Sequence, residues 1–519
     1  MAWTATGLFL IAVLVSVRLW DKGRRKQAEL PSRGFGTTWA TSYLTSTVNV
    51  LRAKAEIQAL ACRYRNQLFT FPLFGEWCVM AASREHVKDH YNAQEEVLSM
   101  EAAAEELLQL HHTVGSLFCS ETYHIPAIRV SLNLNLAAKL PDLLDEMALA
   151  YDEELPVAET WTPLCPSKVY AGIIARASNR IFVGPKLCRN RQYRKLVDGF
   201  SNIVITGGAV IRMAVPGFLR PVVGWLFRSV FGHHRRMVQL VAAEIAERQH
   251  NRAIGKLHLN PNDMLDWLMD QPWEGRTEHS PESLAMRILN VNFVALHTTT
   301  KAGAFTHALY HLASKPEYIP ILRSEVESFL DPLNPQSWSK ESIARCAKLD
   351  SFLKESLRLN GLGAIWMPRL TLSAFEFSDG TVIPPGNFVG TAVTAIHEDE
   401  ANYARAKEFD GLRFYKLGSS AGAVHDQQDD LKADPDSDLQ WQHRLTGTSP
   451  SYLTFGGGKH ICPGRFFASL ELKGLFALLL LRYDVRMADG VRPADKWFGP
   501  VSNPDPNAQV LFRRRSEIP

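Results

Sequence analysis

One cysteine near the C-terminal end of the chain stands in a setting that favours metal chemistry. The stretch from Phe455 to Arg465 reads Phe-Gly-Gly-Gly-Lys-His-Ile-Cys-Pro-Gly-Arg, with Cys462 in its second half. Three glycines let the backbone pass where a Cβ atom would clash, so a flat group fits against this loop. Residues 465–481 have the length and apolar spacing of a buried helix. Cys462 would then precede a helix N-terminus, where amide groups and the helix dipole favour a metal-binding thiolate.

Two interpretations of this loop follow from its residues. A second Cys-Pro pair, Cys165-Pro166, occurs without neighbouring glycines, so a buried structural cysteine in a tight turn is the simpler alternative. The full stretch, however, resembles the haem-binding loop of the cytochromes P-450, in the form Phe-Gly-x-Gly-Lys-His-x-Cys-Pro-Gly-Arg of fungal members. The residues that carry this resemblance are Phe455, Gly458, His460, Cys462 and Gly464.

The resemblance implies a haem b cofactor and a role for each matching residue. Cys462 would be the axial ligand of the iron, where a thiolate pushes electron density onto the metal and favours O–O cleavage. Phe455 and His460 would contact the cofactor, with His460 at a haem propionate.

Two arginines outside the loop are implied as further propionate partners. Arg369 lies in a predicted strand, ahead of an Asp379-Gly380 hairpin turn. Arg129 lies in a segment similar to one in fungal members, although the family's tryptophan four residues earlier is Ile125 here. An ordinary surface arginine is the alternative for Arg129.

A long helical pattern over residues 290–310 carries polar residues at its centre. Thr298, Thr299 and Thr300 are poor helix formers whose hydroxyls bond back to earlier carbonyls and open the helix locally. The segment resembles the family's Ala/Gly-Gly-x-Asp/Glu-Thr-Thr/Ser motif, which implies that Thr298 lies on the oxygen side of the haem. His297 replaces the family's acid, and because histidine exchanges protons near neutral pH we expect His297 and Thr298 to relay protons to dioxygen. A helix kink without a catalytic role is the alternative.

A glutamate and two arginines form a predicted structural lock. Glu355 and Arg358 are three residues apart on one helix face and can pair. An exposed pair of this kind contributes at most about 1 kcal/mol. The spacing resembles the family's Glu-x-x-Arg, and Arg413 stands where the family supplies a second arginine, with Gly411 in place of the family's proline. The resemblance therefore implies a carboxylate held between two guanidiniums beneath the haem loop.

Composition and missing motifs narrow the class of protein. The 519 residues are 46% hydrophobic, enough for a large core, and the net charge of +3 implies no nucleic-acid partner. Seven cysteines without a CxxC pair suit a reducing compartment. The sequence contains no GxGxxG and no GxxxxGK[S/T] motif, so the electrons for an oxidation must come from another protein.

The N-terminal residues predict a membrane anchor. Residues 2–20 are mostly apolar and are followed by a basic cluster. About 19 residues at roughly 1.5 Å each barely span a hydrocarbon layer of ~30 Å. Because the basic cluster follows the span, the remainder of the chain would lie in the cytosol. We expect an anchor at 1–29 and one monooxygenase domain at 30–519. A cleaved signal peptide is the alternative, but no charged region precedes the apolar run.

Two further segments complete the prediction. The resemblance implies that the apolar residues 203–231 form a lid over the substrate channel, which can also dip into the membrane. A plain buried helix pair is the alternative. Residues 417–450 are polar and without period, which predicts a surface loop.

We therefore expect a mainly α fold with a small β region, forming a single globular domain behind its anchor on the cytosolic face of the endoplasmic reticulum. The resemblance implies a haem-thiolate monooxygenase that receives electrons from NADPH through NADPH–cytochrome reductase, with cytochrome b5 as an additional donor. Its substrate would be a hydrophobic small molecule of fungal secondary metabolism, such as a terpenoid or alkaloid. The alternatives are a haem-thiolate isomerase or dehydratase that needs no reductase, and a non-catalytic haem-binding or membrane-bound sensor protein.

Overall fold

The computed structural model describes residues 30–31, 52–73, 76–155, 158–231, 233–256, 260–275, 279–296, 298, 303–425 and 438–516. Three predictions lie outside the described residues, namely the membrane anchor at 1–29, the proton-relay residue His297, and the helix-opening role of Thr299 and Thr300.

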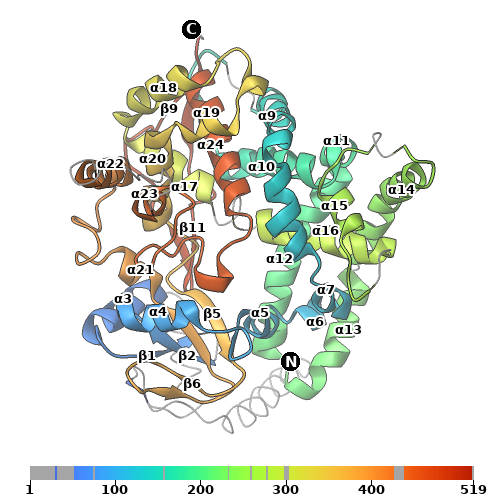
Figure 1. The fold of residues 1–519 in the computed structure, drawn as a ribbon, viewed down its shortest axis with the longest axis vertical. Coiled ribbons are helices and arrows are strands. Elements are labelled where there is room, and N and C mark those ends of the chain that lie inside the picture. Colours follow the sequence, from blue (N-terminus) through green and yellow to red (C-terminus); the bar gives the residue numbers. More distant parts are fainter. Residues whose placement is uncertain are drawn as a thin grey trace, which may run out of the picture.

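Helices make up most of the described chain (Figure 1). The helices of the first half are α3 (Ala53–Arg63), α4 (Arg84–Asn92), α5 (Met100–Leu108), α6 (Leu110–Thr113), α7 (Ser116–Ser120), α8 (His124–Pro126), the π-helix η1 (Ala127–Leu132), α9 (Asn133–Glu154), α10 (Pro166–Phe182), α11 (Gly184–Cys188), α12 (Arg191–Ala214), η2 (Gly217–Leu219), α13 (Arg220–Phe231) and α14 (His233–Ala253). The helices of the second half are α15 (Met264–Asp270), α16 (Pro281–Leu296), α17 (Ala304–Ser314), α18 (Tyr318–Phe329), η5 (Pro335–Ser337), α19 (Lys340–Ala344), α20 (Ala347–Leu359), α21 (Val393–His397), α22 (Arg413–His425), α23 (Asp438–His443), η6 (Gly458–His460) and α24 (Arg465–Arg482).

The strands form small sheets, of which the one with β1, β2 and β5 lies at the lower left of Figure 1, whereas β9 lies near α18 at the top. The largest has the order β1-β2-β8-β5-β3, in which β2 and β8 are parallel and the other neighbours are antiparallel. Smaller sheets have the orders β4-β12-β9, β10-β11 and β6-β7. The strands are β1 (Phe69–Leu73), β2 (Glu76–Ala81), β3 (Leu98–Ser99), β4 (Thr162–Leu164), β5 (Trp366–Thr371), β6 (Phe375–Glu376), β7 (Val382–Ile383), β8 (Phe388–Thr391), β9 (Tyr483–Arg486), β10 (Lys496–Phe498), β11 (Val501–Asn503) and β12 (Val510–Arg514). The predicted fold class, mainly α with a small β region, is confirmed.

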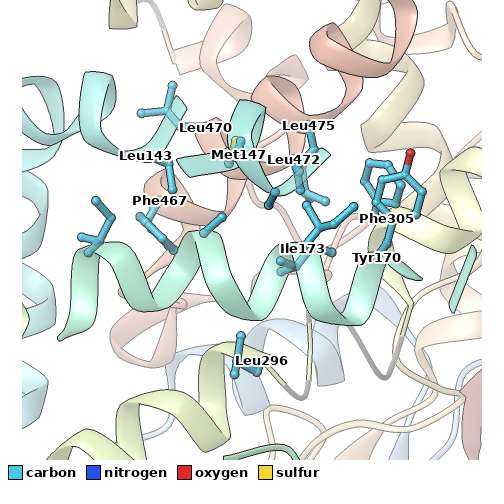
Figure 2. Packing of buried hydrophobic residues seen from close by; sticks show 14 of the residues in the cluster. Leu143, Met147, Tyr170, Ile173, Leu296, Phe305, Phe467, Leu470, Leu472 and Leu475 are labelled. Atoms are coloured by element: carbon cyan, nitrogen blue, oxygen red, sulfur yellow. The ribbon is translucent and has the colours of Figure 1, made fainter. Parts of the chain in front are cut away.

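The helix that follows the cysteine loop lies at the centre of the core. Every residue of α24 from 469 to 481 is buried, as expected for a helix that is apolar all round. Figure 2 shows the leucines of this helix facing Tyr170 and Ile173 of α10, with Phe305 of α17 beside them. The residues before α24 are therefore fixed to the most deeply buried part of the protein.

One carboxyl group is enclosed in this core. Glu471 of α24 is 1% exposed and accepts a hydrogen bond from the hydroxyl of Ser178 on α10. Burial raises the pKa of Glu471 to about 8, although the bond from Ser178 acts in the opposite direction. This carboxyl group is consequently protonated in the folded protein at neutral pH.

Local sequence signals predicted several elements correctly. Strands β1 and β2, which the aromatic and β-branched residues of the stretch 69–81 favour, pair in antiparallel fashion, and the Ser83 side chain accepts from the amide of His86 at the start of α4, as an N-cap does. Gly380 has φ +84° in the turn that joins β6 to β7. The surface-loop prediction for 417–450 was wrong in part, because α22 reaches His425 and α23 covers Asp438–His443.

Tertiary contacts explain this error. The Ser351 hydroxyl of α20 donates to the carbonyl of Gly411 at 2.9 Å and accepts from the amide of Tyr415 at 3.0 Å. These bonds fix the first turn of α22, so the helix forms although serine and glycine within it are weak helix formers.

The apolar region 203–231 forms the end of α12, then η2 and α13. By length and composition, α12 is the one helix of the described residues that could cross a membrane. Within its apolar window, however, 44% of the residues are buried inside the protein, and the helix packs against α5 and α16.

The next helix, α13, presents apolar side chains to solvent and keeps its arginines on the protein. Arg228 donates to the carbonyl of His111 at 2.9 Å, and Arg220 lies 3.7 Å from Glu106. We call its exposed apolar face, together with one residue of η2, the α13 stripe; its members are at least 55% exposed and are Phe218, Val222, Trp225, Leu226 and Val230.

Candidate functional site

The glycine-rich loop is closed by one backbone bond and by a tyrosine from α4. The Cys462 amide donates to the carbonyl of Phe455 at 2.7 Å, so the two ends of the loop meet. Gly456 and Gly458 have φ of +82° and +57°, which glycine adopts without strain. A Cβ atom on Gly457 would lie 1.4 Å from the ring of Tyr91. The close approach that glycine permits at this position is therefore made by a tyrosine of the same chain.

The Cys462 side chain is half-buried at the start of α24. Burial raises the pKa of its thiol, while amide hydrogen bonds from Gly464 and Arg465 and the charge of Arg465 act in the opposite direction. The predicted effect of the helix terminus is thus present, but burial outweighs it. A coordinated metal ion deprotonates a thiol outright, so this site matches a cysteine whose thiolate form depends on the metal.

A buried arginine beside the loop has the properties of an anion-binding group. Arg369 of β5 is fully buried, and one of its terminal nitrogens donates to the carbonyl of Ala93 at 3.3 Å. Within the described part of the chain, its Nε and its other terminal nitrogen have no hydrogen-bond partner. Burial lowers the pKa of Arg369 to about 10, with the charge of Glu95 opposing the shift. Because a buried cation with two unpartnered nitrogens is costly, the site fits a carboxylate such as a haem propionate.

Two more predicted residues lie beside this arginine. His460 Nε2 is 3.3 Å from Glu95 Oε2, and Arg129 donates to the carbonyl of Lys459 at 3.3 Å. Burial lowers the pKa of His460, and the nearby charges of Arg369 and Arg129 lower it further against the effect of Glu95. The structure therefore brings Arg369, Arg129 and His460 together around one positively charged region, where a cofactor's carboxylates would fit.

Glu95 was not predicted. Its carboxylate accepts from the Ser99 hydroxyl at 2.7 Å and from the amide of Met100 at 3.0 Å, both at the start of α5. Its negative charge opposes the lowering of the pKa of both Arg369 and His460. The only signal for Glu95 in the sequence is its spacing of four residues from Ser99, at the start of a helix. This spacing indicates helix capping and does not mark a binding site.

Thr298 lies just beyond Leu296, the last residue of the helix α16. Its hydroxyl donates to the carbonyls of Val294 at 3.0 Å and Ala295 at 3.3 Å. The predicted back-bonding of this threonine is confirmed. The next helix, α17, begins at Ala304 after Gly303, whose φ is +78°. The pattern predicted as one long helix therefore has a break at Gly303.

The predicted lock residues are in direct contact. Arg358 donates from Nε and from a terminal nitrogen to the two oxygens of Glu355, each at 2.8 Å. Arg413 Nε donates to Glu355 Oε1 at 3.0 Å, and so does the amide of Asp410 at 3.1 Å. Glu355 and Arg358 are buried, and Arg413 is 9% exposed. The carboxylate thus lies between two guanidiniums, with a bidentate bond to the first.

The structure thus places Cys462 before a central buried helix, with the buried Arg369 beside the loop in a position suited to an anion. The sequence profile of the family described as Cytochrome P450 matches residues 57–512. The chain belongs to the cytochrome P-450 family and is a monooxygenase, hence an oxidoreductase; haem with a thiolate ligand is the cofactor of this family.

Fungal relatives extend this similarity over nearly the whole chain. "Cytochrome P450 monooxygenase 151" of Postia placenta is 34% identical over 93% of this chain and 94% of its own length. "Cytochrome P450 monooxygenase paxQ" of Penicillium paxilli is 29% identical over 98% and 97%, and "Cytochrome P450 monooxygenase olcJ" of Penicillium canescens is 28% identical over 99% and 92%.

Proposed function

We propose that this chain holds haem b through Cys462 and inserts one oxygen atom from dioxygen into a hydrophobic small molecule. The observation that carries the proposal is the combination of Cys462 at the start of α24 with the buried, partly unpaired guanidinium of Arg369. When bound, haem supplies the activation of dioxygen. The thiolate of Cys462 would ligate the iron, and Arg369, His460 and Arg129 would hold the two propionates.

Thr298 and His297 would handle the protons that the reaction needs. The Thr298 hydroxyl donates to the Val294 and Ala295 carbonyls of its own chain segment, so rotation frees it to hold a water or a proton near the substrate. His297, the residue before it, passes protons to Thr298 in this proposal. The lock of Glu355, Arg358 and Arg413 keeps the segments beneath the cysteine loop in place.

Electrons come from NADPH through NADPH–cytochrome reductase, with cytochrome b5 as an additional donor, because the chain carries no dinucleotide-binding motif. A hydrophobic secondary metabolite, such as a terpenoid or alkaloid, is the proposed substrate class. Its support is the similarity to fungal monooxygenases that include paxQ and olcJ.

We propose that the protein works at the endoplasmic reticulum membrane. The α13 stripe supports a membrane contact by the folded domain, since its tryptophan and aliphatic side chains face solvent while Arg228 and Arg220 turn toward the protein. Exposed apolar patches of this kind mark membrane or protein contacts in soluble domains. The anchor predicted at residues 1–29 would provide the stronger attachment.

The difference spectrum of the reduced, carbon monoxide-bound protein tests the proposed ligand. A thiolate-ligated haem gives a band at a distinctive long wavelength, which we expect for the native chain and not for Cys462→Ser. Its absence from haem-loaded native protein would refute ligation by Cys462. Product formation that depends on NADPH and reductase separates oxygen insertion from an isomerase or dehydratase reaction, which would proceed without either.

A further inference from the structure

A buried histidine joins the structural lock to the cysteine loop. His397, the last residue of α21, is 3% exposed. Its Nδ1 is 2.9 Å from the carbonyl oxygen of Arg358, and its Nε2 accepts from the amide of Leu453 at 3.0 Å. In return, an Arg358 guanidinium nitrogen donates to the carbonyl of His397. The imidazole therefore contacts a lock residue on one edge and the backbone that enters the loop on the other.

These partners fix the protonation state of the ring. The carbonyl oxygen of Arg358 can only accept, so Nδ1 carries the proton, while the amide of Leu453 can only donate, so Nε2 is bare. The same conclusion follows from charge, because burial lowers the pKa of His397 to about 3, and Arg358 and Lys354 add to that shift against the bond to the Arg358 carbonyl. A neutral ring of one tautomer bridges the two segments.

From Leu453 the hydrogen bonds continue to the cysteine. The Gly456 amide donates to the carbonyl of Leu453 at 2.9 Å, and the Cys462 amide donates to the carbonyl of Phe455 at 2.7 Å. The hydrogen bonds of His397 therefore lead to the turn between Leu453 and Gly456 at the start of the loop. Phe455, whose carbonyl accepts the bond from the Cys462 amide, belongs to this turn.

The ring has little freedom to leave this position. It stacks on Tyr452 with centroids 5.5 Å apart and planes at 16°. On the same tyrosine ring lies the ammonium group of Lys354, 3.5 Å from the centroid. The Tyr452 hydroxyl donates to the Lys354 carbonyl at 3.3 Å, so the tyrosine is itself held to α20, the helix of Glu355 and Arg358. Packing and hydrogen bonds thus select one orientation of the imidazole.

We propose that His397 is a positioning residue that sets the cysteine loop relative to the Glu355–Arg358–Arg413 lock, and through the loop keeps Cys462 in place to ligate the iron. This inference rests on the proposed ligation by Cys462. Because His397 bonds both to Arg358 of the lock and to the backbone before the loop, a displacement of the lock would also displace Cys462.

Four substitutions separate this role from a general contribution to stability. His397→Asn retains a donor at the place of Nδ1 but loses the bond to Leu453. His397→Gln retains an acceptor at the place of Nε2 and keeps that bond. His397→Phe keeps the stacking on Tyr452 and loses both bonds. His311→Phe is the matched control, since His311 is also buried, stacks on Phe409 at 3.9 Å and bonds to the Asn360 side chain, away from the loop.

The readouts are hydrogen exchange at the Leu453 amide, the rate of haem transfer to excess apomyoglobin, and the fraction of carbon monoxide complex in the long-wavelength thiolate band. Loss of one hydrogen bond changes the corresponding equilibrium constant by about tenfold. We expect amide protection to fall and haem release to accelerate by about that factor in the Asn and Phe variants, with a lower thiolate fraction. The Gln variant and His311→Phe should keep native protection at Leu453.

Each result of these measurements either supports or contradicts the positioning role of His397. If His397→Asn matches the native protein in all three readouts, or if His311→Phe loses the thiolate band as readily, His397 does not position the loop. Should His397→Phe fail to fold, the contrast between the Asn and Gln variants still decides the question. If the native protein itself lacks the thiolate band, the proposed function fails first, while exchange at Leu453 in the haem-free variants still reports on the bridge.

Discussion

Replacing Glu355 with glutamine removes the negative charge that lies between two buried guanidiniums. Glu355 is fully buried, and it accepts two bonds from Arg358, one from Arg413 and one from the Asp410 amide. In the Glu355→Gln variant the amide oxygen still accepts one or two of these bonds, but the amide nitrogen faces a guanidinium donor. Both arginines then remain buried without a compensating charge.

The size of the effect follows from this burial. Breaking a buried ion pair by removing one partner costs about 3–5 kcal/mol. A folded protein is stable by only about 5–15 kcal/mol, so this loss is a large part of the total. Backbone carbonyls also accept from both arginines, among them those of Ala406 and Glu408, which keeps the guanidiniums hydrogen-bonded and favours the lower end of the range.

Urea unfolding of the haem-free variant, followed by circular dichroism, measures the loss. The matched control is Glu408→Gln, because Glu408 pairs with Arg405 at 3.5 Å where the two side chains are 67% and 72% exposed. A surface pair of this kind contributes about 0–1 kcal/mol. If Glu355→Gln lowers the free energy of unfolding no more than the control does, the lock is not the stabilising element that its geometry indicates. A second test adds Arg413→Met, which should cost less in the Glu355→Gln variant than in the native chain.

Three further predictions follow. Arg369→Leu should weaken haem binding by about tenfold or more in equilibrium titration. It should also raise the stability of the haem-free protein, because a buried cation with two unpaired nitrogens is removed. A haem affinity equal to that of the native protein would contradict the assignment. Glu471 has a pKa raised to about 8 in the folded state from an ordinary value of 4.5, so the folded state binds more protons between these values and stability falls as pH rises through them. The slope of the unfolding free energy against pH is at most about 1.4 kcal/mol per pH unit between the two pKa values, and Glu471→Gln should remove it. Urea unfolding at several pH values measures this slope. An unchanged slope would show that the carboxyl group is ionised. Thr298→Ala and His297→Ala should each lower the product formed per NADPH consumed while Thr298→Ser retains it, and unchanged coupling in either alanine variant would exclude that residue from proton transfer.

The parts of the fold that sequence predicts well are local. The hairpin of β1 and β2, the Ser83 cap and the helix after Cys462 each depend on residues close together in the chain. The lock was also predictable, since Glu355 and Arg358 share a helix face, although Arg413 was placed by resemblance alone. Helix α22 was missed because its first turn is held by Ser351, 64 positions before the Tyr415 amide that it binds.

The residues that sequence reasoning missed at the site are those that act across long chain separations. His397 bonds to Leu453, 56 positions away, and to Arg358, 39 positions away. A lone histidine after the apolar stretch that begins at Ala392 carries no periodic or motif signal that would mark it as a bridge. Glu95 and Tyr91 were overlooked for the same reason, since their partners in the loop lie near the opposite end of the chain.

Because Tyr91 and Gly457 are in contact, the side chain at one of these positions limits the substitutions that the other can accept. Because any Cβ atom at position 457 would overlap the tyrosine ring, even alanine at this position requires the Tyr91 ring to move. A smaller residue at position 91 would open space for a side chain at 457, but it would also give up the bond between the tyrosine hydroxyl and Thr448. A substitution at position 457 is therefore best combined with one at position 91, and a library that randomises the loop alone should be enriched in glycine at 457.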